Sequence, residues 1–371
     1  MEYFINVLLP VATSGVYTYC SNNDLPAGVR VKVPLGRRTL VGISLGGTTA
    51  PTFECREILE IMDDTSIFSA TWLAFIKRLS EYYAAPLGTT LHGVLSSKLI
   101  NSIDVGASVH DEQERGENIT LTPEQAEVVA KIPTKGYSTH LIQGVTGSGK
   151  TEVYLELAKK VIAEGKQALY LVPEIALTPQ LVDRVQSRTG AKPALFHSKL
   201  SDKVRIASFW RFIRGEDNIL IGPRSALFVP STNIGLIIID EEHENTYKQE
   251  ETPTYHLRDM AILYASMLDI PIVLGSATPQ VESIHNAQIG KYNIHYLRSR
   301  TGTAILPKLD IIDMKQNNLV AGIMAEPLYD KLCSTVENGE QAIIFLNRKG
   351  YSTSLFCSSC GAIMECLNCS V

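Results

Sequence analysis

The chain has 371 residues, 45% of them hydrophobic and 20% charged, with a formal net charge of −5 at pH 7. This composition is typical of a globular protein of two or three domains; it excludes low-complexity and collagen-like chains, and also a globally basic nucleic-acid binder. The longest apolar stretches are too short to cross a bilayer and residues 1–10 lack the pattern of a signal peptide, so we expect a cytoplasmic protein that does not bind membranes.

Residues 1–105 are predicted to form a small β-rich domain. Short segments of alternating apolar residues, broken by Gly, Pro and Asn, predict strands at 3–9, 29–33 and 40–45. Apolar residues spaced for one face predict a helix over 69–83. Four basic residues lie in a stretch without acidic side chains: Arg30, Lys32, Arg37 and Arg38. They form either a patch that contacts DNA phosphates or a solvated strand face.

Residues 106–119 are almost wholly polar and charged, which predicts a linker. From residue 120 to about 300, apolar strands alternate with amphipathic helices, and this alternation predicts an α/β fold with a parallel sheet covered by helices. The predicted strands are 139–143, 168–172, 219–221, 236–240 and 272–275. A less regular stretch follows around 301–322, and a further strand is predicted at 341–346.

Residues 144–151 match the pattern G-x-x-x-x-G-K-[ST], between a predicted strand and a predicted helix at 152–163. Glycines let the backbone curl, so that its N–H groups and the helix N-terminus face phosphate oxygens. We therefore predict a nucleotide site formed by Gly144, Val145, Thr146, Gly147, Ser148, Gly149, Lys150 and Thr151. Lys150 would bridge the β- and γ-phosphates, and the Thr151 hydroxyl would bind Mg²⁺. The alternative is a glycine-rich turn without a ligand.

The predicted strand 236–240 ends in an acidic run, which begins with Asp240 and Glu241. Asp240 suits a ligand of Mg²⁺, and Glu241 suits the general base that activates water. Together with the glycine-rich loop, this pair favours nucleotide hydrolysis over binding alone. The alternative is a solvated loop.

Gln125 has two compatible interpretations. It could contact adenine, or it could complete a capping box with Thr122 as the N-cap and Pro123 at the first helical position. Farther along, Ser276 and Thr278 follow a predicted strand, and small hydroxyl residues there can couple the nucleotide site to a second ligand. Without the other motifs they would mark only a turn.

Six segments together resemble the superfamily 2 helicases, and more narrowly the PriA family of replication-restart helicases: 144–154, 172–180, 222–228, 239–251, 274–279 and 345–351. Two N-terminal segments, LLPVATSGVYTY and RVKVPLGRR, resemble the same family, so the likeness spans the chain. The resemblance implies a 3′-end DNA-binding domain at 1–105 and a RecA-like first helicase lobe with a P-loop at 120–300. It also implies that 301–356 is a connection and the start of a second RecA-like lobe.

The resemblance also implies a function. Members of this family are ATP-dependent 3′-to-5′ DNA helicases that recognise stalled or abandoned replication forks and initiate primosome assembly. The expected cofactors are ATP, Mg²⁺ and Zn²⁺. The expected partners are forked and single-stranded DNA, primosome proteins and the single-stranded-DNA-binding protein, with the chain itself a monomer. Two alternatives stay open: a fork-DNA-binding fragment without catalysis, and another superfamily 2 DNA translocase.

Several DNA contacts follow from the resemblance. Arg224 would contact the DNA backbone, although Pro223 stands where the family usually has Thr. The segment after the acidic run resembles the family's aromatic-rich loop, which senses single-stranded DNA. Its residues of interest are Tyr247, Lys248, Tyr255 and His256. Rings of this kind stack on bases, or alternatively pack beneath the loop.

In the N-terminal domain, the resemblance assigns DNA contacts to Lys32, Arg37 and Arg38. Tyr17 and Tyr19 would stack on the 3′-terminal nucleotide. Thr18 stands between them where the family commonly has Asp, and the acidic hydrogen-bond partner is thereby lost. We therefore expect weak discrimination between 3′-hydroxyl and blocked ends.

The final segment, 357–371, holds two C-x-x-C pairs: Cys357, Cys360, Cys366 and Cys369. In a cytoplasmic chain such pairs indicate zinc ligands. The resemblance implies two interleaved Cys₄ sites, of which this chain has half the ligands. The family's winged helix has no room near 101–118, and the second lobe is only begun. We therefore expect a partial sequence, for which binding of DNA and nucleotide without unwinding is one expected behaviour.

Overall fold

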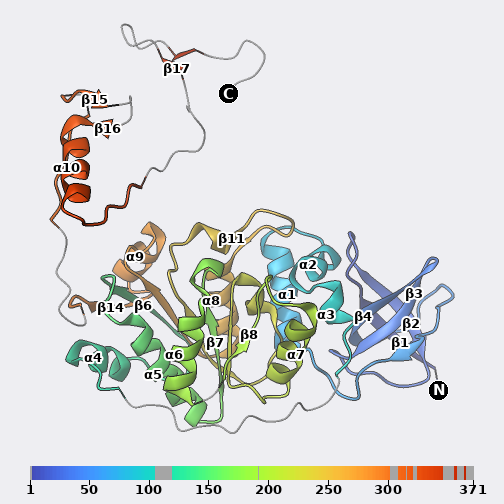
Figure 1. The fold of residues 1–371 in the computed structure, drawn as a ribbon. Coiled ribbons are helices and arrows are strands. Elements are labelled where there is room, and N and C mark those ends of the chain that lie inside the picture. The colour runs from blue at the N-terminus through green and yellow to red at the C-terminus, as the bar shows by residue number, and fades with distance from the viewer. Residues whose placement is uncertain are drawn as a thin grey trace. The chain divides into compact units, whose positions relative to one another are not determined.

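The computed structural model (Figure 1) describes residues 2–104, 119–190, 192–300, 308–314, 316–320, 324–345, 355–356 and 363–364. The chain divides into two compact units, unit 1 (Met1–Ala304) and unit 2 (Ile305–Val371). Apart from Ile119, the predicted linker 106–119 lies outside the described residues. The expectation that no winged helix fits near 101–118 falls almost wholly on the same residues.

Unit 1 begins with a five-stranded antiparallel sheet in the order β2-β1-β4-β3-β5. Its strands are β1 (Tyr3–Leu8), β2 (Val16–Ser21), β3 (Arg30–Leu35), β4 (Arg38–Thr48) and β5 (Glu60–Ile61). Because side chains alternate between the two faces of a strand, Ile5 and Val7 of β1 share one core with Val31 and Val33 of β3. The predicted β-rich domain is confirmed.

The second sheet of unit 1 has seven parallel strands in the order β14-β6-β13-β10-β7-β9-β8. They are β6 (Ser138–Gly144), β7 (Gln167–Leu171), β8 (Ala194–Leu195), β9 (Ile219–Gly222), β10 (Ile234–Ile239), β13 (Pro271–Ser276) and β14 (Asn293–Leu297). The five predicted strands are present, which confirms the parallel α/β sheet. The sequence did not predict the edge strands, because β8 is short and β14 carries Asn293 and His295 among its apolar residues.

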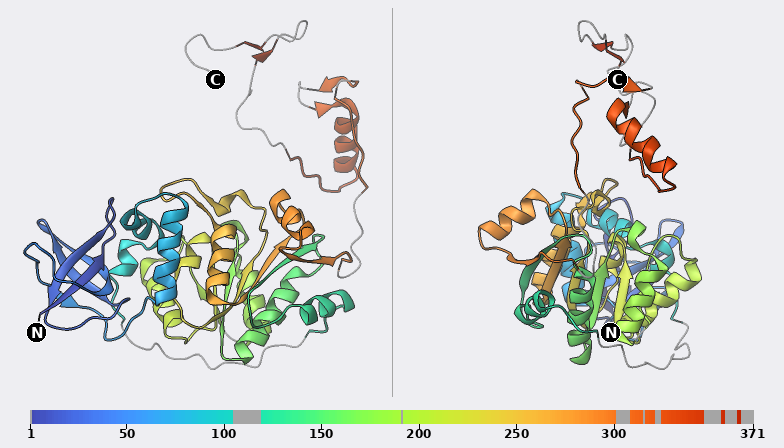
Figure 2. Two further views of the ribbon diagram at one scale, coloured as in Figure 1. Left: turned by 180° about the vertical axis from the view of Figure 1, so that it is seen from behind. Right: turned by 60° about the vertical axis from the view of Figure 1, so that its left-hand side comes forward.

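Helices cover both faces of this sheet (Figure 2). One face carries α4 (Pro123–Lys131), α5 (Lys150–Ala163) and α6 (Pro179–Thr189), and the other carries α1 (Ala70–Tyr82), α7 (Asp202–Ile213) and α8 (Leu257–Leu268). The division follows from alternation along the strands. In β7, Ala168 and Tyr170 pack with the first group, whereas Leu169 and Leu171 pack with the second.

Local sequence sets the helix ends. The Ser69 hydroxyl accepts a hydrogen bond from Trp72 N and so caps the start of α1. Helix α6 ends at Gly190, whose φ of 74° lies in the left-handed region that favours glycine. The remaining short elements of unit 1 are α2 (Leu87–Val94), α3 (Ser97–Ile100), α9 (Val281–Gln288), β11 (Lys248–Gln249), β12 (Tyr255–His256) and 3₁₀ turns at Glu174–Ala176, Arg224–Phe228 and Asn245–Tyr247.

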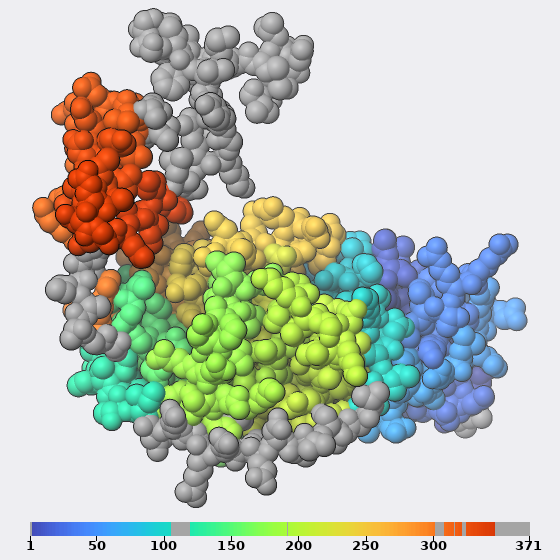
Figure 3. Space-filling view, viewed as in Figure 1, coloured from blue at the N-terminus to red at the C-terminus, as the bar shows by residue number. Residues whose placement is uncertain are grey.

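Helix α1 joins the N-terminal region to the seven-stranded sheet. Its Phe75 ring stacks on Tyr264 of α8, with ring centroids 4.4 Å apart, and its Trp72 Nε1 donates to Phe228 O at 3.1 Å. The five-stranded sheet therefore stands at one end of unit 1, beside α1 to α3 (Figure 3). The two sheets are connected through a shared hydrophobic core rather than through a flexible tether.

Arg30 corrects one expectation for the basic cluster. Its side chain is only 2% exposed and forms an ion pair with Asp63 at 2.6 Å. Its Nη1 donates to Ile100 O and Ser102 O, and its guanidinium lies over the Trp210 ring. Arg30 therefore holds the N-terminal sheet against α3 and α7 and does not face DNA.

Unit 2 contains α10 (Glu326–Glu337) and two short ladders: β15 (Leu319–Val320) with β16 (Met324–Ala325), and β17 (Leu355–Phe356) with β18 (Ile363–Met364). The strand predicted at 341–346 is wrong over its described part, because residues 341–345 pair with no strand. Ile343 and Phe345 are 96% and 86% exposed. A strand needs a neighbour for its backbone hydrogen bonds, and the described part of unit 2 gives this apolar run none.

Candidate nucleotide-binding site

The glycine-rich loop connects β6 to α5, as predicted. Gly147 and Gly149 have φ values of 81° and 78°, and Gly149 is the N-cap of α5. These angles lie in the left-handed region, where glycine avoids the steric cost of a Cβ. A Cβ at Gly144 would lie 2.6 Å from Ser148 Oγ, so the loop closes too tightly for any side chain there. The loop thus curls tightly and leads directly into the N-terminus of α5.

Two groups in this loop fit a phosphate. The buried Ser148 hydroxyl has no hydrogen-bond partner in the structure. The buried Lys150 ammonium donates to Gly144 O, a backbone acceptor, at 3.1 Å. Since buried hydroxyls and ammonium groups are normally paired, an anion that accepts from both would satisfy the loop. The residues present therefore fit the phosphates of a nucleotide.

Gln125 completes the capping box of α4, and it also holds the loop. Its Oε1 accepts from Thr122 N at 2.9 Å, while its Nε2 donates to Ser148 O at 2.9 Å. The structure thus contains the predicted capping box. The same amide also donates a hydrogen bond to the glycine-rich loop. Contact with adenine stays a prediction.

Asp240 follows β10 and is held by three donors. The phenols of Tyr154 and Tyr170 donate to its Oδ1 and Oδ2, each at 3.2 Å, and Glu241 N donates to Oδ1 at 3.0 Å. Burial raises the pKa of Asp240, the charge of Glu241 raises it further, and the nearby Lys150 ammonium opposes both. A carboxylate oriented in this way, close to Lys150, suits a ligand of Mg²⁺.

The two tyrosines that hold Asp240 were not predicted from the sequence. Tyr154 comes from α5, one turn after Lys150, and Tyr170 comes from β7; both are buried. Burial and the Asp240 charge raise the pKa of both phenols well above their usual range, so they stay protonated and act as donors. The Thr151 hydroxyl contacts the Tyr170 phenol, which in turn donates to Asp240.

Glu241 adopts a strained backbone conformation. Its φ of 46° is positive, which is uncommon outside glycine and occurs often at functional sites. Its side chain is 37% exposed, with Oε2 3.5 Å from His243 Nδ1. That same nitrogen lies 2.7 Å from Ser276 Oγ, which accepts from Thr278 N at 2.9 Å. A polar chain therefore runs from the proposed general base to both proposed coupling residues.

The Tyr154 phenol leaves no room for a side chain at Gly275, and substitution of this glycine tests the packing. A Cβ there would lie 1.5 Å from Tyr154 Oη, and the buried tyrosine has no space to retreat. We expect Gly275→Ala to lower the free energy of unfolding by about 3 kcal/mol, the upper end for overpacking. Urea denaturation measures this. Gly47→Ala is the control, since its nearest neighbour is 3.8 Å away, and equal stability of the two variants would contradict the packing argument.

The loop that follows the acidic run is hydrogen-bonded to the backbone of Asp240. Tyr247 Oη donates to Asp240 O at 2.7 Å, and Arg224 Nη1 donates to Thr246 O and Lys248 O. The rings of Tyr247 and Tyr255 are 1% and 5% exposed, so in this structure they pack beneath the loop and offer no face to a base. The Lys248 side chain is exposed. His256 is half-buried, and its backbone N–H donates to Tyr83 Oη.

The N-terminal residues divide in the same way. Arg37 and Arg38 are exposed at the turn between β3 and β4, whereas Lys32 pairs with Glu60 at 2.6 Å. The Tyr19 ring is buried, with its hydroxyl donating to Pro34 O. Stacking by Tyr19 therefore has no exposed face in this structure.

Tyr17 is half-buried, and its hydroxyl lies 3.2 Å from Thr13 Oγ1. Thr18, on the other face of β2, donates to Asn6 Oδ1 at 2.9 Å. The hydroxyl that replaces the family's carboxylate is thus engaged within the sheet. Weak discrimination of 3′ ends stays a prediction.

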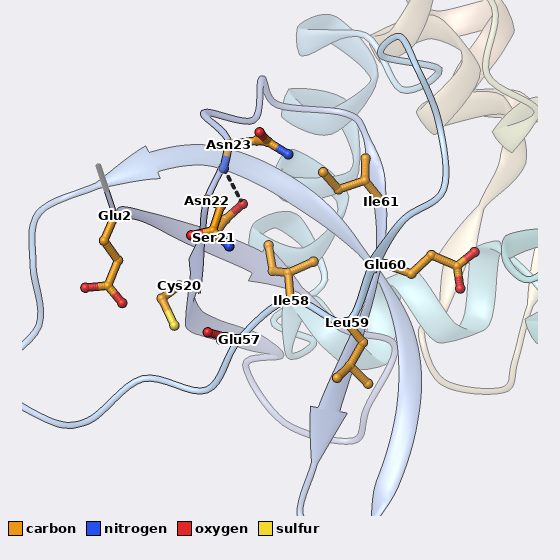
Figure 4. A pocket seen from close by; sticks show the side chains of 10 residues that line it. All are labelled: Glu2, Cys20, Ser21, Asn22, Asn23, Glu57, Ile58, Leu59, Glu60 and Ile61. Carbon is orange, nitrogen blue, oxygen red and sulfur yellow. Dashed lines mark hydrogen bonds between the residues drawn. The ribbon is translucent and has the colours of Figure 1, made fainter.

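A cavity of about 210 Å³ lies at the end of β2 (Figure 4). Its lining residues include Glu2, Glu57, Glu60 and Cys20, and the Glu60 carboxylate points away from the others and pairs with Lys32.

The described residues hold neither the four C-terminal cysteines nor a candidate metal cluster or membrane span. The four C-terminal cysteines lie outside them. Within the described ranges, no cluster of three or more His, Cys, Asp or Glu side chains could hold a metal ion. Across the same ranges, no helix is both long and apolar enough to cross a membrane.

Comparison with known families gives two matches. Residues 6–96 match a family described as the PriA 3′ DNA-binding domain (3′BD), and residues 122–287 match the family of DEAD/DEAH box helicases. The first match spans the five-stranded sheet with α1 and α2. The second match spans the glycine-rich loop, the acidic run and Ser276.

Several curated proteins named replication restart protein PriA have similar sequences. The protein of Bacillus subtilis (strain 168) is 42% identical over 261 residues, which cover 69% of this chain and 32% of that protein. Those of Treponema pallidum (strain Nichols) and Haemophilus influenzae are 34% and 32% identical over 98% of this chain, with 56% and 61% of their own lengths covered. The chain thus spans about half the length of these two relatives.

Among solved structures, RecG bound to a three-way DNA junction matches with a TM-score of 0.43 and 19% identity. The match covers 72% of this chain and 33% of the RecG chain.

Proposed function

The chain belongs to the PriA replication restart family, and we propose that it acts as an ATP-dependent 3′-to-5′ DNA helicase. In this proposal the protein recognises stalled or abandoned replication forks and initiates primosome assembly. Forked and single-stranded DNA are its substrates, and primosome proteins and the single-stranded-DNA-binding protein are its partners. The protein acts in the cytoplasm in this proposal.

The hydrolytic part of this proposal rests on the position of Asp240. Its carboxylate lies close enough to the Lys150 ammonium to be influenced by it, and the Tyr154 phenol that holds it comes from the same helix as Lys150. Two motifs that lie far apart in the sequence therefore form one polar site. A metal ligand beside a phosphate-binding lysine is the arrangement that phosphoryl transfer requires.

Each side chain then has a role. Mg²⁺ bound with the nucleotide would neutralise negative charge on the phosphates. Lys150 would exchange Gly144 O for a phosphate oxygen, and Asp240 would be kept in place by its three donors. Glu241, half-exposed and strained, would accept the proton of the attacking water. A shift of the Glu241 side chain would be transmitted through His243 and Ser276 to Thr278.

The exposed cations are the first DNA contacts in this proposal: Arg37, Arg38 and Lys248. Arg224 would act on DNA through the loop that it holds by two carbonyls. Stacking by Tyr247 and Tyr255 requires this loop to open. Opening would break the bond from Tyr247 to Asp240 O, and this supports a link between DNA contact and the nucleotide site.

The four cysteines are proposed as zinc ligands on sequence grounds alone: Cys357, Cys360, Cys366 and Cys369. Tetrahedral sulfur coordination would suit them.

Strand separation from a forked duplex tests the proposed function. The chain is mixed with a fork whose strand is fluorescently labelled, in the presence of Mg²⁺ and either ATP or a non-hydrolysable analogue. We expect release of the strand with ATP and no release with the analogue. Binding of the fork without release, in a sample that hydrolyses ATP, would contradict helicase activity of the chain.

A further inference from the structure

The first turn of α4 contacts two segments at once. Gln125 holds the nucleotide loop through Ser148 O, as described above. The adjacent Glu124 accepts three hydrogen bonds from the residues that follow β14: Arg298 N at 3.0 Å, Ser299 N at 3.2 Å and Ser299 Oγ at 3.0 Å. A single helical turn therefore joins the glycine-rich loop to the two residues that follow β14.

A second connection runs between the same segments. Val145, the residue after Gly144 in the loop, donates its N–H to Leu297 O at 3.2 Å. Leu297 is the last residue of β14 and lies opposite Gly144 in the ladder with β6. The end of β14 is thus hydrogen-bonded to the nucleotide loop directly, and to α4 through Glu124.

Strand β14 lies at the edge of the sheet, next to the glycine-rich loop. It is an edge strand, paired only with β6 within the described residues (Figure 1). An open hollow of about 370 Å³ lies at the surface beside α4 and β14, lined by Glu124, Val128, Tyr296 and Arg298 among others. Because an edge strand has a hydrogen-bonded neighbour on one side only, a shift of β14 disturbs a single ladder.

Nucleotide binding would act at the junction of these contacts. The Lys150 ammonium now bonds to Gly144 O, which belongs to the residue paired with Leu297. Phosphate oxygens compete for that ammonium, since charge-assisted hydrogen bonds to anions are stronger than those to a neutral carbonyl. Loss of this bond changes the end of β6 beside β14.

We propose that Glu124 is a positioning residue, which transmits the nucleotide state of the P-loop to Arg298 and Ser299, the residues that follow β14. The inference rests on the proposed function for the presence of a nucleotide, and adds the route by which its binding is sensed. In the nucleotide-free state the carboxylate fixes the two backbone N–H groups after β14. In the bound state the end of β14 shifts and these bonds change.

Hydrogen exchange at single amides tests the route in the full 371-residue chain. The amides of Arg298 and Ser299 are followed with and without a saturating, non-hydrolysable ATP analogue and Mg²⁺. In the wild-type chain we expect the nucleotide to change their exchange rates several-fold. In Glu124→Ala we expect the rates to rise only several-fold, because the charged acceptor that is lost lies at the surface, and no longer to respond to nucleotide.

Two further variants separate positioning from folding. Glu127→Ala lies on the same helix, with a carboxylate that is 65% exposed and pairs with Lys131, and it should behave as the wild type. Glu124→Gln keeps an acceptor oxygen and should restore part of the protection if Glu124→Ala is too unstable to measure. Affinity for the nucleotide analogue, measured on the same samples, should differ by less than about threefold among these variants.

The outcomes are distinguishable. Nucleotide binding without any change at Arg298 and Ser299 in the wild type overturns the inference and leaves the proposed function in place. An equal response in Glu124→Ala overturns it as well. Absence of nucleotide binding by the wild type overturns the proposed function, and the inference falls with it.

Discussion

Glu241→Gln is expected to slow ATP hydrolysis about 10²- to 10⁴-fold, the contribution typical of a positioned general base. The amide keeps the size of the side chain but cannot accept the proton of water. Because the Glu241 side chain is partly exposed and makes only a 3.5 Å contact with His243, its replacement removes no buried interaction. Nucleotide affinity and the free energy of unfolding should therefore stay close to the wild-type values.

Steady-state phosphate release measures this effect, and fluorescence of a labelled ATP analogue measures binding in parallel. Glu250→Gln is the matched control, because its carboxylate lies in the same segment and is 83% exposed. It should hydrolyse ATP at the wild-type rate. A Glu241→Gln variant with more than about a tenth of wild-type activity would remove Glu241 from the role of general base.

Glu242→Ala is expected to have the opposite profile, a loss of stability of about 3–5 kcal/mol. Glu242 is fully buried, and its Oε2 pairs with Arg258 Nη1 at 3.3 Å. Its oxygens also accept from Gln280 N at 2.8 Å and Ser283 Oγ at 3.0 Å, at the start of α9. Removal of the carboxylate leaves the buried Arg258 charge without its full complement of acceptors.

Urea denaturation of the wild type and two variants tests this expectation. Glu250→Ala is the control, since an exposed pair with 3.9 Å between Lys248 and Glu250 contributes little, about 0.5 kcal/mol or less. Equal unfolding midpoints for Glu242→Ala and Glu250→Ala would show that the buried pair does not stabilise α9. The adjacent residues Glu241 and Glu242 thus separate catalysis from folding within one motif.

Sequence patterns predicted the parts of the fold that repeat a local rule. The strand–loop–helix around Lys150 follows from glycine spacing, and the five interior strands follow from continuous apolar runs. Strand β14 has no such run, because an edge strand pairs on one side only and tolerates His295. The strand predicted at 341–346 has the apolar run but no neighbour in the described residues.

Side-chain partners across the fold could not be predicted, because spacing along the chain does not encode them. Tyr154 and Tyr170 look like ordinary core aromatics in the sequence, yet both donate to Asp240. Arg30 looks like part of a basic patch, but its long side chain reaches Asp63 and two carbonyls in the interior. Each role depends on a residue that lies far away in the chain.

The most direct test of the account is ATP hydrolysis by the chain, with and without single-stranded DNA, for the wild type and Lys150→Ala. The account predicts hydrolysis that DNA stimulates, and loss of both the basal and the stimulated rates in Lys150→Ala with the fold retained. Hydrolysis that is unchanged by Lys150→Ala, or none at all by the folded wild type in the presence of DNA, would contradict the assignment of the loop and the acidic run to one catalytic site.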